Sequence, residues 1–238
     1  MSYFIYNGIS SKELGVRIQA KNIYSAPKYD VTMISIPGRN GELVSPNGHF
    51  PNVSLSYTCY LPAKSITELS NKITVVKNWL YKEPDRYHNL TDGYDEKFIR
   101  KAIFNSKLDI GDECRKIGTF TVSFSCKPFR YNRASLEKST YTGTFQLFNP
   151  YSFSSKPYLK INGRGQGTLT INNKVWTFTT LNGYTECDSE LMNFYHDTEL
   201  KNDMVTGEGF PELLPGNNNI SFDGGITSVE IIPRWWTL

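Results

Sequence analysis

The chain has 238 residues, 39% hydrophobic and 21% charged, which is the composition of a folded protein of one large or two ordinary domains. Its formal net charge of +3 is too small to indicate nucleic-acid binding, and no apolar stretch approaches the roughly 20 residues that a membrane span needs. The first residues, MSYFIYNGISSKELGVRI, lack a basic segment followed by a long apolar core, so no signal peptide is predicted.

Two segments alternate apolar and polar residues and predict half-buried strands. Residues 53–61, VSLSYTCYL, place their apolar side chains on one face, and residues 119–126, TFTVSFSC, repeat the pattern. Tight turns are predicted where Asn or Asp precedes Gly, at 7–8, 40–41, 47–48, 92–93, 162–163, 182–183 and 223–224. Short strands joined by such turns indicate a mainly β protein.

One segment has helical spacing instead. In SITELSNKITVVKNWLYKEP, the apolar residues Ile66, Leu69, Ile73, Val76 and Leu80 form one stripe. Ser65 and Glu68 have the spacing of a capping box, Lys82 stands in the last predicted turn, and Pro84 is a stop signal. We predict one helix of about 18 residues here.

The four cysteines, Cys59, Cys114, Cys126 and Cys187, are scattered and form no C-x-x-C pair. Cys59 and Cys126 fall on the apolar phase of the two predicted strands, so we expect buried free thiols. This usage indicates a protein that folds in a reducing cytosol.

Residues 132–143, NRASLEKSTYTG, are polar, lack periodicity and predict a linker. The predicted division is therefore a helix-bearing β domain over 1–131, the linker, and an all-β domain over 144–238. Hairpin signals at 162–167 and at INNKVW, with a strand at TSVEIIP, favour a β-sandwich or jelly roll for the second domain.

The segment KINGRGQGTLTINN carries three glycines at alternate positions, Gly163, Gly165 and Gly167. A phosphate-binding loop requires a helix directly after such glycines, whereas the residues that follow are β-branched and alternating. We interpret the glycines as a hairpin bend, with Gly163 at a positive φ after Asn162.

No group of residues predicts a metal site, a cofactor or an enzymatic activity. His49, His88 and His196 lie far apart, and none has a second histidine at zinc-ligand spacing. DIGDEC, residues 109–114, lacks the ligand pattern of a calcium loop and is interpreted as a solvated turn. ECDSE, residues 186–190, contains acids from which a glycosidase pair can be built, but their separation is not readable from sequence.

The basic cluster CKPFRYNR, residues 126–133, interleaves Lys127, Arg130 and Arg133 with Phe129 and Tyr131. Nucleic-acid binding is one interpretation, and a solvated strand end with stacked aromatic rings is the one that we favour at this net charge. The residues alone thus indicate a two-domain β protein used for binding or structure.

The chain contains, in order, FIYNGISSKELGVRI, YDVTMISIPGRNGELV, the helix ending in WL, YHNLTDGYDEKFIRKAIF, GTFTVSFSCKPFRY, FNPYSFSSKPYLKINGRGQGTLTINN, GYTECDSELMNFY, GFPELLPGNNNISFDGG and VEIIPRWW. This ordered set resembles the distal tail protein (Dit) family of long-tailed, non-contractile phages of Gram-positive bacteria. The resemblance covers nearly the whole chain.

The resemblance implies a mainly β fold, with an N-terminal β-sandwich-like domain that carries one helix, followed by a galectin-like β-sandwich. It implies a homohexameric ring in the distal tail of a virion, made in the cytoplasm of the bacterial host. The implied partners are the tail tube protein, a tail-tip or tail-associated protein, and a host-receptor-binding protein. The resemblance also implies a central channel through which DNA passes without specific binding, and it implies no membrane insertion, catalysis or cofactor.

Two sets of contact residues are expected. The turn made of Pro37, Gly38, Arg39, Asn40 and Gly41 is the expected subunit or partner contact, because an exposed loop beside a strand end often meets the next subunit. The alternative function is a carbohydrate-binding module for the host cell wall, in which Trp235 or Trp236 stacks on sugar, since sugars stack on indole faces. Trp176 lies in a strand-like run and is expected in the core.

Overall fold

The computed structural model describes residues 2–238 and contains two compact units. The first consists of the chain up to Arg130 together with Leu238, and the second of Tyr131–Thr237. Both are mainly β, and the one α-helix among the described residues belongs to the first unit, which confirms the predicted fold class.

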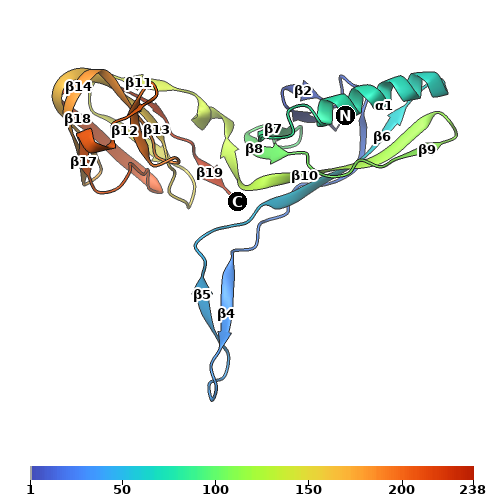
Figure 1. Cartoon of the computed structure of the whole chain (residues 1–238), viewed down its shortest axis with the longest axis horizontal. Coiled ribbons are helices and arrows are strands. Elements are labelled where there is room, and N and C mark those ends of the chain that lie inside the picture. Colours follow the sequence, from blue (N-terminus) through green and yellow to red (C-terminus); the bar gives the residue numbers. More distant parts are fainter. Residues whose placement is uncertain (1) are drawn as a thin grey trace. The chain divides into compact units, whose positions relative to one another are not determined.

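The first unit contains ten strands and a helix, although the last two residues of β10 belong to the second unit (Figure 1). Its elements are β1 (Phe4–Tyr6), β2 (Ile9–Ser10), β3 (Arg17–Asn22), β4 (Val31–Ser35), β5 (Glu42–Pro46), β6 (Val53–Pro62), α1 (Ile66–Leu80), β7 (His88–Asp92), β8 (Phe98–Ile103), β9 (Ile110–Glu113) and β10 (Ile117–Asn132).

The main sheet of this unit has the order β2-β1-β7-β8-β10-β6-β3, with β9 beside β10. Although β1 and β6 are not neighbours in this order, the rings of Phe4 and Tyr57 lie 4.4 Å apart. The sheet therefore curls so that distant strands face each other across one core, as in a sandwich. The alternation predicted for 53–61 and 119–126 is confirmed, since all the apolar residues of that phase in β6 and β10 are buried.

Helix α1 covers the core of this unit. Ser65 is its N-cap, and the hydroxyl accepts from the Glu68 amide at 3.2 Å. The Glu68 carboxylate reaches back to the amide of Lys64 at 2.8 Å, one residue earlier than in a standard capping box. The helix ends at Leu80, about two residues before the predicted end. Ile66, the first residue of the predicted apolar stripe, is 51% exposed.

Cys59 and Cys126 are buried free thiols, as predicted. They lie in β6 and β10, on the core side of the sheet, and burial raises the pKa of each thiol to about 12. Cys187 is also a buried free thiol, whereas Cys114 is exposed.

The second unit contains nine strands and two short 3₁₀ helices. Its elements are η1 (Arg133–Leu136), β11 (Ser139–Tyr141), β12 (Phe145–Asn149), β13 (Tyr158–Ile171), β14 (Lys174–Asp188), β15 (Asn193–His196), β16 (Glu199–Leu200), η2 (Asn202–Met204), β17 (Val205–Gly207), β18 (Gly216–Ile232) and β19 (Trp236–Thr237).

Three long strands, β18, β13 and β14, build both layers of this unit. Residues 158–162 of β13 pair with the second half of β14 and of β18, where β11 and β15 extend the sheet. Residues 167–171 pair with their first halves, where β12 and β17 extend it. Core residues from both parts of β13, such as Ile161 and Leu169, share one hydrophobic cluster, so each long strand bends from one layer into the other.

The glycines of KINGRGQG lie at that bend, inside β13, and the expected hairpin at 162–167 is wrong. Gly165 has the positive φ of 80°, and Gly163 does not have one. Gly163 is required for another reason, because a Cβ there would lie 2.3 Å from the carbonyl oxygen of Gly225. The hairpin predicted at INNKVW is confirmed, with Asn172 at φ 55° between β13 and β14.

The segment 132–143, predicted as a linker, is folded. It contains η1, and β11 pairs with β18 from Ser139↔Ile231 to Tyr141↔Val229. Polar composition misled the sequence interpretation, since β11 is a short edge strand whose side chains are mostly solvent-facing.

Candidate assembly site

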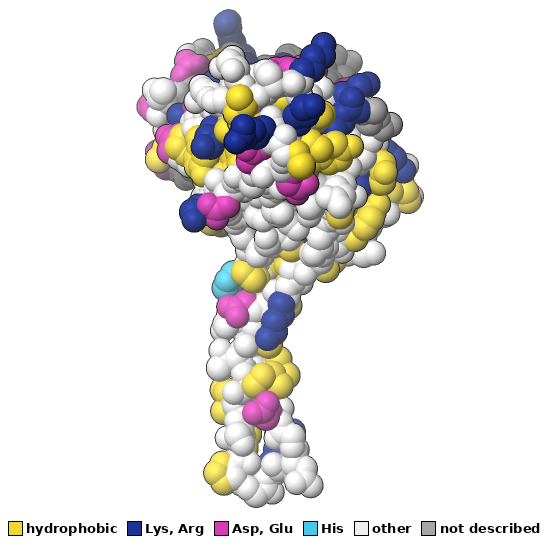
Figure 2. Space-filling view, turned by 90° about the vertical axis from the view of Figure 1, so that its right-hand side faces the viewer, with side chains coloured by type: hydrophobic (Ala, Val, Ile, Leu, Met, Phe, Trp, Pro, Cys, Tyr) yellow, Lys and Arg dark blue, Asp and Glu magenta, His cyan; other side chains and the backbone are white. Residues whose placement is uncertain are grey.

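Strands β4 and β5 form a hairpin that is separate from the main sheet of the first unit, and we call residues 31–46 the arm (Figure 1). Among residues 2–238, the two strands pair only with each other, from Val31↔Pro46 to Ser35↔Glu42. Figure 2 shows the arm standing clear of the rest of its unit, with hydrophobic side chains along it. An isolated two-stranded hairpin is marginally stable in water, so the arm lacks the support that other strands receive.

The arm exposes apolar side chains on both of its faces. Met33 pairs with Val44 on one face, and Ile34 pairs with Leu43 on the other. These four side chains are 49%, 53%, 43% and 46% exposed, respectively. Apolar residues that are exposed side by side typically mark a contact surface for another molecule.

The root of the arm is tied by polar and aromatic contacts. The amide of Asp30 donates to the carbonyl of His49 at 3.1 Å, and the amide of Asn47 donates to the carbonyl of Asp30 at 3.0 Å. The ring of Phe50 lies 4.9 Å from that of Tyr29 and 5.9 Å from that of Phe129 in β10. These contacts fix the point at which the arm leaves the unit.

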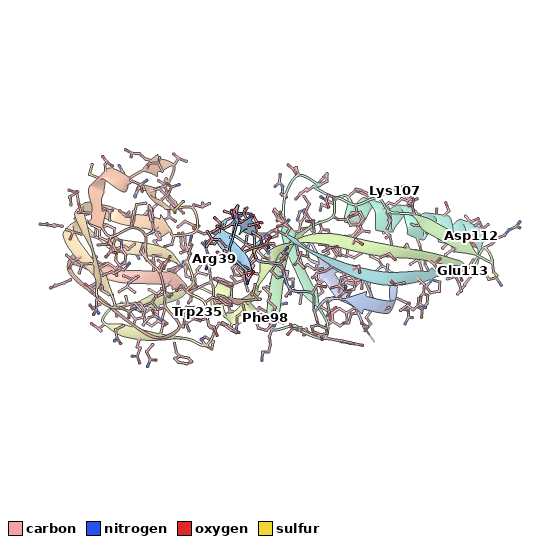
Figure 3. The ribbon with its side chains drawn as sticks, turned by 90° about the horizontal axis from the view of Figure 1, so that it is seen from below. Arg39, Phe98, Lys107, Asp112, Glu113 and Trp235 are labelled. Atoms are coloured by element: carbon pink, nitrogen blue, oxygen red, sulfur yellow. The ribbon has the colours of Figure 1, made fainter. Side chains whose placement is uncertain are left out.

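The turn Pro37 to Gly41 is the tip of the arm, and all five residues are exposed. The amide of Arg39 donates to the carbonyl of Ile36 at 3.1 Å, and Gly38 and Gly41 have φ of 78° and 81°. Figure 3 looks along the arm and shows where Arg39 lies at its end. The turn was predicted from the sequence, but the exposed apolar residues on its flanks were not, although MISI and ELV on either side of it are a readable signal.

The two tryptophans expected to stack on sugar lie in different surroundings. Trp235 is 8% exposed and belongs to the hydrophobic cluster of the second unit, so its ring is not available to a sugar. One face of Trp236 is stacked on Phe153, with centroids 4.5 Å apart, and its indole nitrogen donates to the Ser154 carbonyl at 3.0 Å. Trp176 is buried, as expected.

The acidic segments do not converge on a metal site, since residues 2–238 hold no group of three or more His, Cys, Asp or Glu side chains placed to bind a metal ion. Asp112 and Glu113 are exposed on β9 and follow Lys107, which pairs with Asp109 at 2.9 Å (Figure 3). In the second unit, Asp188 is engaged by Arg234 through two contacts of 2.8 Å.

Two of the basic residues of 126–133, Lys127 and Arg130, have contacts within the first unit. Arg130 pairs with Asp95 at 2.8 Å, and its guanidinium lies 4.5 Å from the ring centre of Phe98. Lys127 lies 5.5 Å from the ring centre of Tyr87. These cations pack on aromatic rings, which agrees with the interpretation as a strand end rather than as a nucleic-acid surface.

A groove of about 200 Å³ in the second unit lies beside Tyr184 and His196. The His196 ring stacks on Tyr184 with centroids 4.2 Å apart, and the Lys160 ammonium lies 3.7 Å from the same tyrosine ring centre. The Tyr184 ring is therefore already engaged by two neighbouring side chains of its own unit.

The fold has a solved counterpart. The Dit protein of phage SPP1, described as a paradigm of the hub adsorption apparatus in phages that infect Gram-positive bacteria, superposes with a TM-score of 0.76 at 13% identity, over 97% of each chain. The chain has the Dit fold.

Two structures of the phage p2 baseplate in its activated conformation are also similar to the chain. The structure with strontium has a TM-score of 0.49 at 7% identity and covers 97% of this chain and 98% of that one. The structure with calcium has a TM-score of 0.49 at 9% identity and covers 97% and 96%. No protein-family model and no curated protein matches the sequence. Within residues 2–238, no helix has the length and apolar character needed to cross a membrane.

Proposed function

We propose that six copies of this chain form a ring in the distal tail of a phage, with a structural rather than an enzymatic role. The ring joins the tail tube to tail-tip or baseplate proteins and to host-binding proteins, and leaves a channel for DNA. The protein is made in the cytoplasm of the bacterial host and then becomes part of the virion. The Dit fold over the whole length of the chain supports a tail role.

The arm is the observation that carries the assembly proposal. Its apolar side chains are about half exposed on both faces, and burying the exposed half of one of them stabilises a contact by roughly 1 kcal/mol. A contact that covers only one face leaves the other exposed, so we place the arm between neighbouring subunits. A head-to-tail contact of this kind closes into a ring when the rotation between copies allows it.

In this arrangement the tip Pro37–Gly41 contacts the next copy. Arg39 is the charged residue of the tip. We expect Arg39→Glu to weaken assembly, since it reverses the charge at the contact without changing the folded unit. A second variant, Met33→Glu with Ile34→Lys, removes an apolar side chain from each face of the arm and is expected to abolish assembly.

Light scattering on the purified chain tests both variants. A hexamer weighs about 163 kDa, six times the 27.2 kDa of one chain. The matched control is Lys174→Glu, the same charge reversal in an exposed residue of the second unit, and it should leave the mass unchanged. A strict monomer at high concentration contradicts the ring, and unchanged hexamers in both arm variants contradict the role of the arm.

A further inference from the structure

Two neighbouring strands of the main sheet, β6 and β10, carry an unbroken run of hydroxyl side chains on the face that alternates with the core. In β6 and β10, the positions that alternate with the buried core residues, from 54 to 60 and from 119 to 125, are all Ser, Thr or Tyr. We call this set the hydroxyl face; its members are Ser54, Ser56, Thr58, Tyr60, Thr119, Thr121, Ser123 and Ser125.

The pairing register places these side chains opposite one another. Ser54 pairs with Ser125, Thr58 with Thr121, and Tyr60 with Thr119. Side chains on paired residues point to the same face of a sheet, so the eight hydroxyls form one continuous surface, about 20 Å long at the usual rise per residue. None of the eight residues is buried.

An open groove of about 480 Å³ lies over part of this face, and its lining is also neutral. Thr58, Thr119, Thr121 and Ser123 line it. The charged residues in the lining are Lys107 and Asp109, which pair with each other at 2.9 Å. The net charge of the groove is therefore zero.

The composition of the hydroxyl face is not typical of a tight subunit contact, of an ordinary solvent-exposed face or of a phosphate-binding face. Protein interfaces are depleted in Ser and enriched in large aromatic and apolar side chains, so a tight subunit contact is not indicated. A face that simply meets solvent usually mixes charges of both signs. A face that binds phosphate carries Lys or Arg, and here none of the eight positions does.

We propose that the hydroxyl face lines the channel of the ring and that its neutrality lets a DNA duplex pass without being held. This inference rests on the proposed function, since it requires the ring. In a hexamer each side chain occurs six times, so one lysine on this face places six positive charges around the duplex. Hydroxyl groups keep the wall hydrated and form no ion pair with phosphate.

Thiol labelling of the full-length chain tests this placement. Thr121→Cys is made in a Cys114→Ser background, because Cys114 is the one exposed cysteine and burial raises the pKa of Cys59, Cys126 and Cys187 to about 12, which leaves them unreactive. The control is Asn173→Cys in the exposed β13–β14 turn. Each variant is treated with a small maleimide and with a maleimide coupled to a particle wider than the central opening of the ring, as measured by electron microscopy.

The expected result is that the small reagent labels both variants, whereas labelling by the bulky reagent is lost at Thr121→Cys alone. Labelling of Thr121→Cys by both reagents places the face outside the ring and overturns the proposal. Loss of labelling by both reagents places it in a protein contact and also overturns it. Light scattering on the same samples separates these outcomes from failure of the proposed function, because a monomer removes the ring itself.

Discussion

At the residue scale, the Asp188–Arg234 ion pair joins the end of β14 to the segment between β18 and β19. Both contacts are 2.8 Å, and the side chains are mostly buried. Burial alone raises the pKa of Asp188, but the Arg234 guanidinium and the amides of Leu191 and Glu190 outweigh it and lower the pKa. We expect Arg234→Gln to lower the free energy of unfolding of this unit by roughly 2 kcal/mol, since it leaves a carboxylate partly buried without its cation.

The pH dependence of this loss has a defined sign. Because the folded pKa of Asp188 is below its unfolded value of about 3.9, the stabilisation is fully present above that value and is lost as the pH falls through the folded pKa. Urea unfolding followed by tryptophan fluorescence should therefore show a constant difference between wild type and Arg234→Gln near neutral pH and a shrinking one below about pH 4. The control is Lys174→Gln, which removes the cation of an exposed ion pair and should lower the free energy of unfolding by less than about 0.5 kcal/mol. A similar loss in both variants contradicts the prediction.

At the element scale, the bend of β13 depends on close contact between two backbones. A Cβ on Gly225 of β18 would lie 2.0 Å from the carbonyl oxygen of Arg164 in β13, and a backbone atom cannot move aside as a side-chain end can. Gly225→Ala should therefore lower the free energy of unfolding of the second unit by about 3 kcal/mol. Gly143→Ala is the control, since a Cβ there meets nothing within 4 Å and its φ is not positive.

Tryptophan fluorescence during urea unfolding measures this loss. Trp176, Trp235 and Trp236 report on the second unit, and Trp79 is in the first. If Gly225→Ala unfolds at the same urea concentration as Gly143→Ala, the close approach of the strands does not constrain the fold. An expressed but insoluble Gly225→Ala chain agrees with the prediction.

The sequence predicted those elements whose cause is local. Alternation in 53–61 identified β6, and the spacing of Ser65 and Glu68 identified the start of α1. The bend of β13 was not predictable in the same way, because it follows from the approach of Gly163 to Gly225, 62 positions later in the chain.

The candidate site was predicted only in part, because some of its features depend on contacts between residues that are distant in the sequence. The tip of the arm is a local turn signal, whereas the isolation of β4 and β5 depends on which strands pair with each other. Trp235 is buried because it packs in a cluster with residues far away in the sequence, such as Leu159 and Ile161, and this packing has no local sequence signal. The hydroxyl face is the polar half of the same alternation whose apolar half predicted β6 and β10.

At the scale of the whole molecule, the net charge of the ring and its distribution have separate effects. Six chains of +3 give a formal charge of +18, which favours weak, non-specific attraction of DNA. The hydroxyl face contributes none of this charge. A ring with a neutral channel wall attracts DNA to its outside at low salt and releases it as salt increases.

Thr121→Lys tests this separation, because Thr121 is exposed on the hydroxyl face and the substitution adds six charges to one level of the proposed channel. We expect the variant ring to bind a short DNA duplex more tightly than wild type, with a slope of log affinity against log salt steeper by up to about 5, the value for six phosphate contacts. Asn173→Lys adds the same six charges at an exposed turn of the second unit, where they do not surround a duplex. Fluorescence anisotropy at several salt concentrations compares the three rings. Equal slopes for the two lysine variants mean that Thr121 does not face the duplex, and the channel wall must then be formed by another surface.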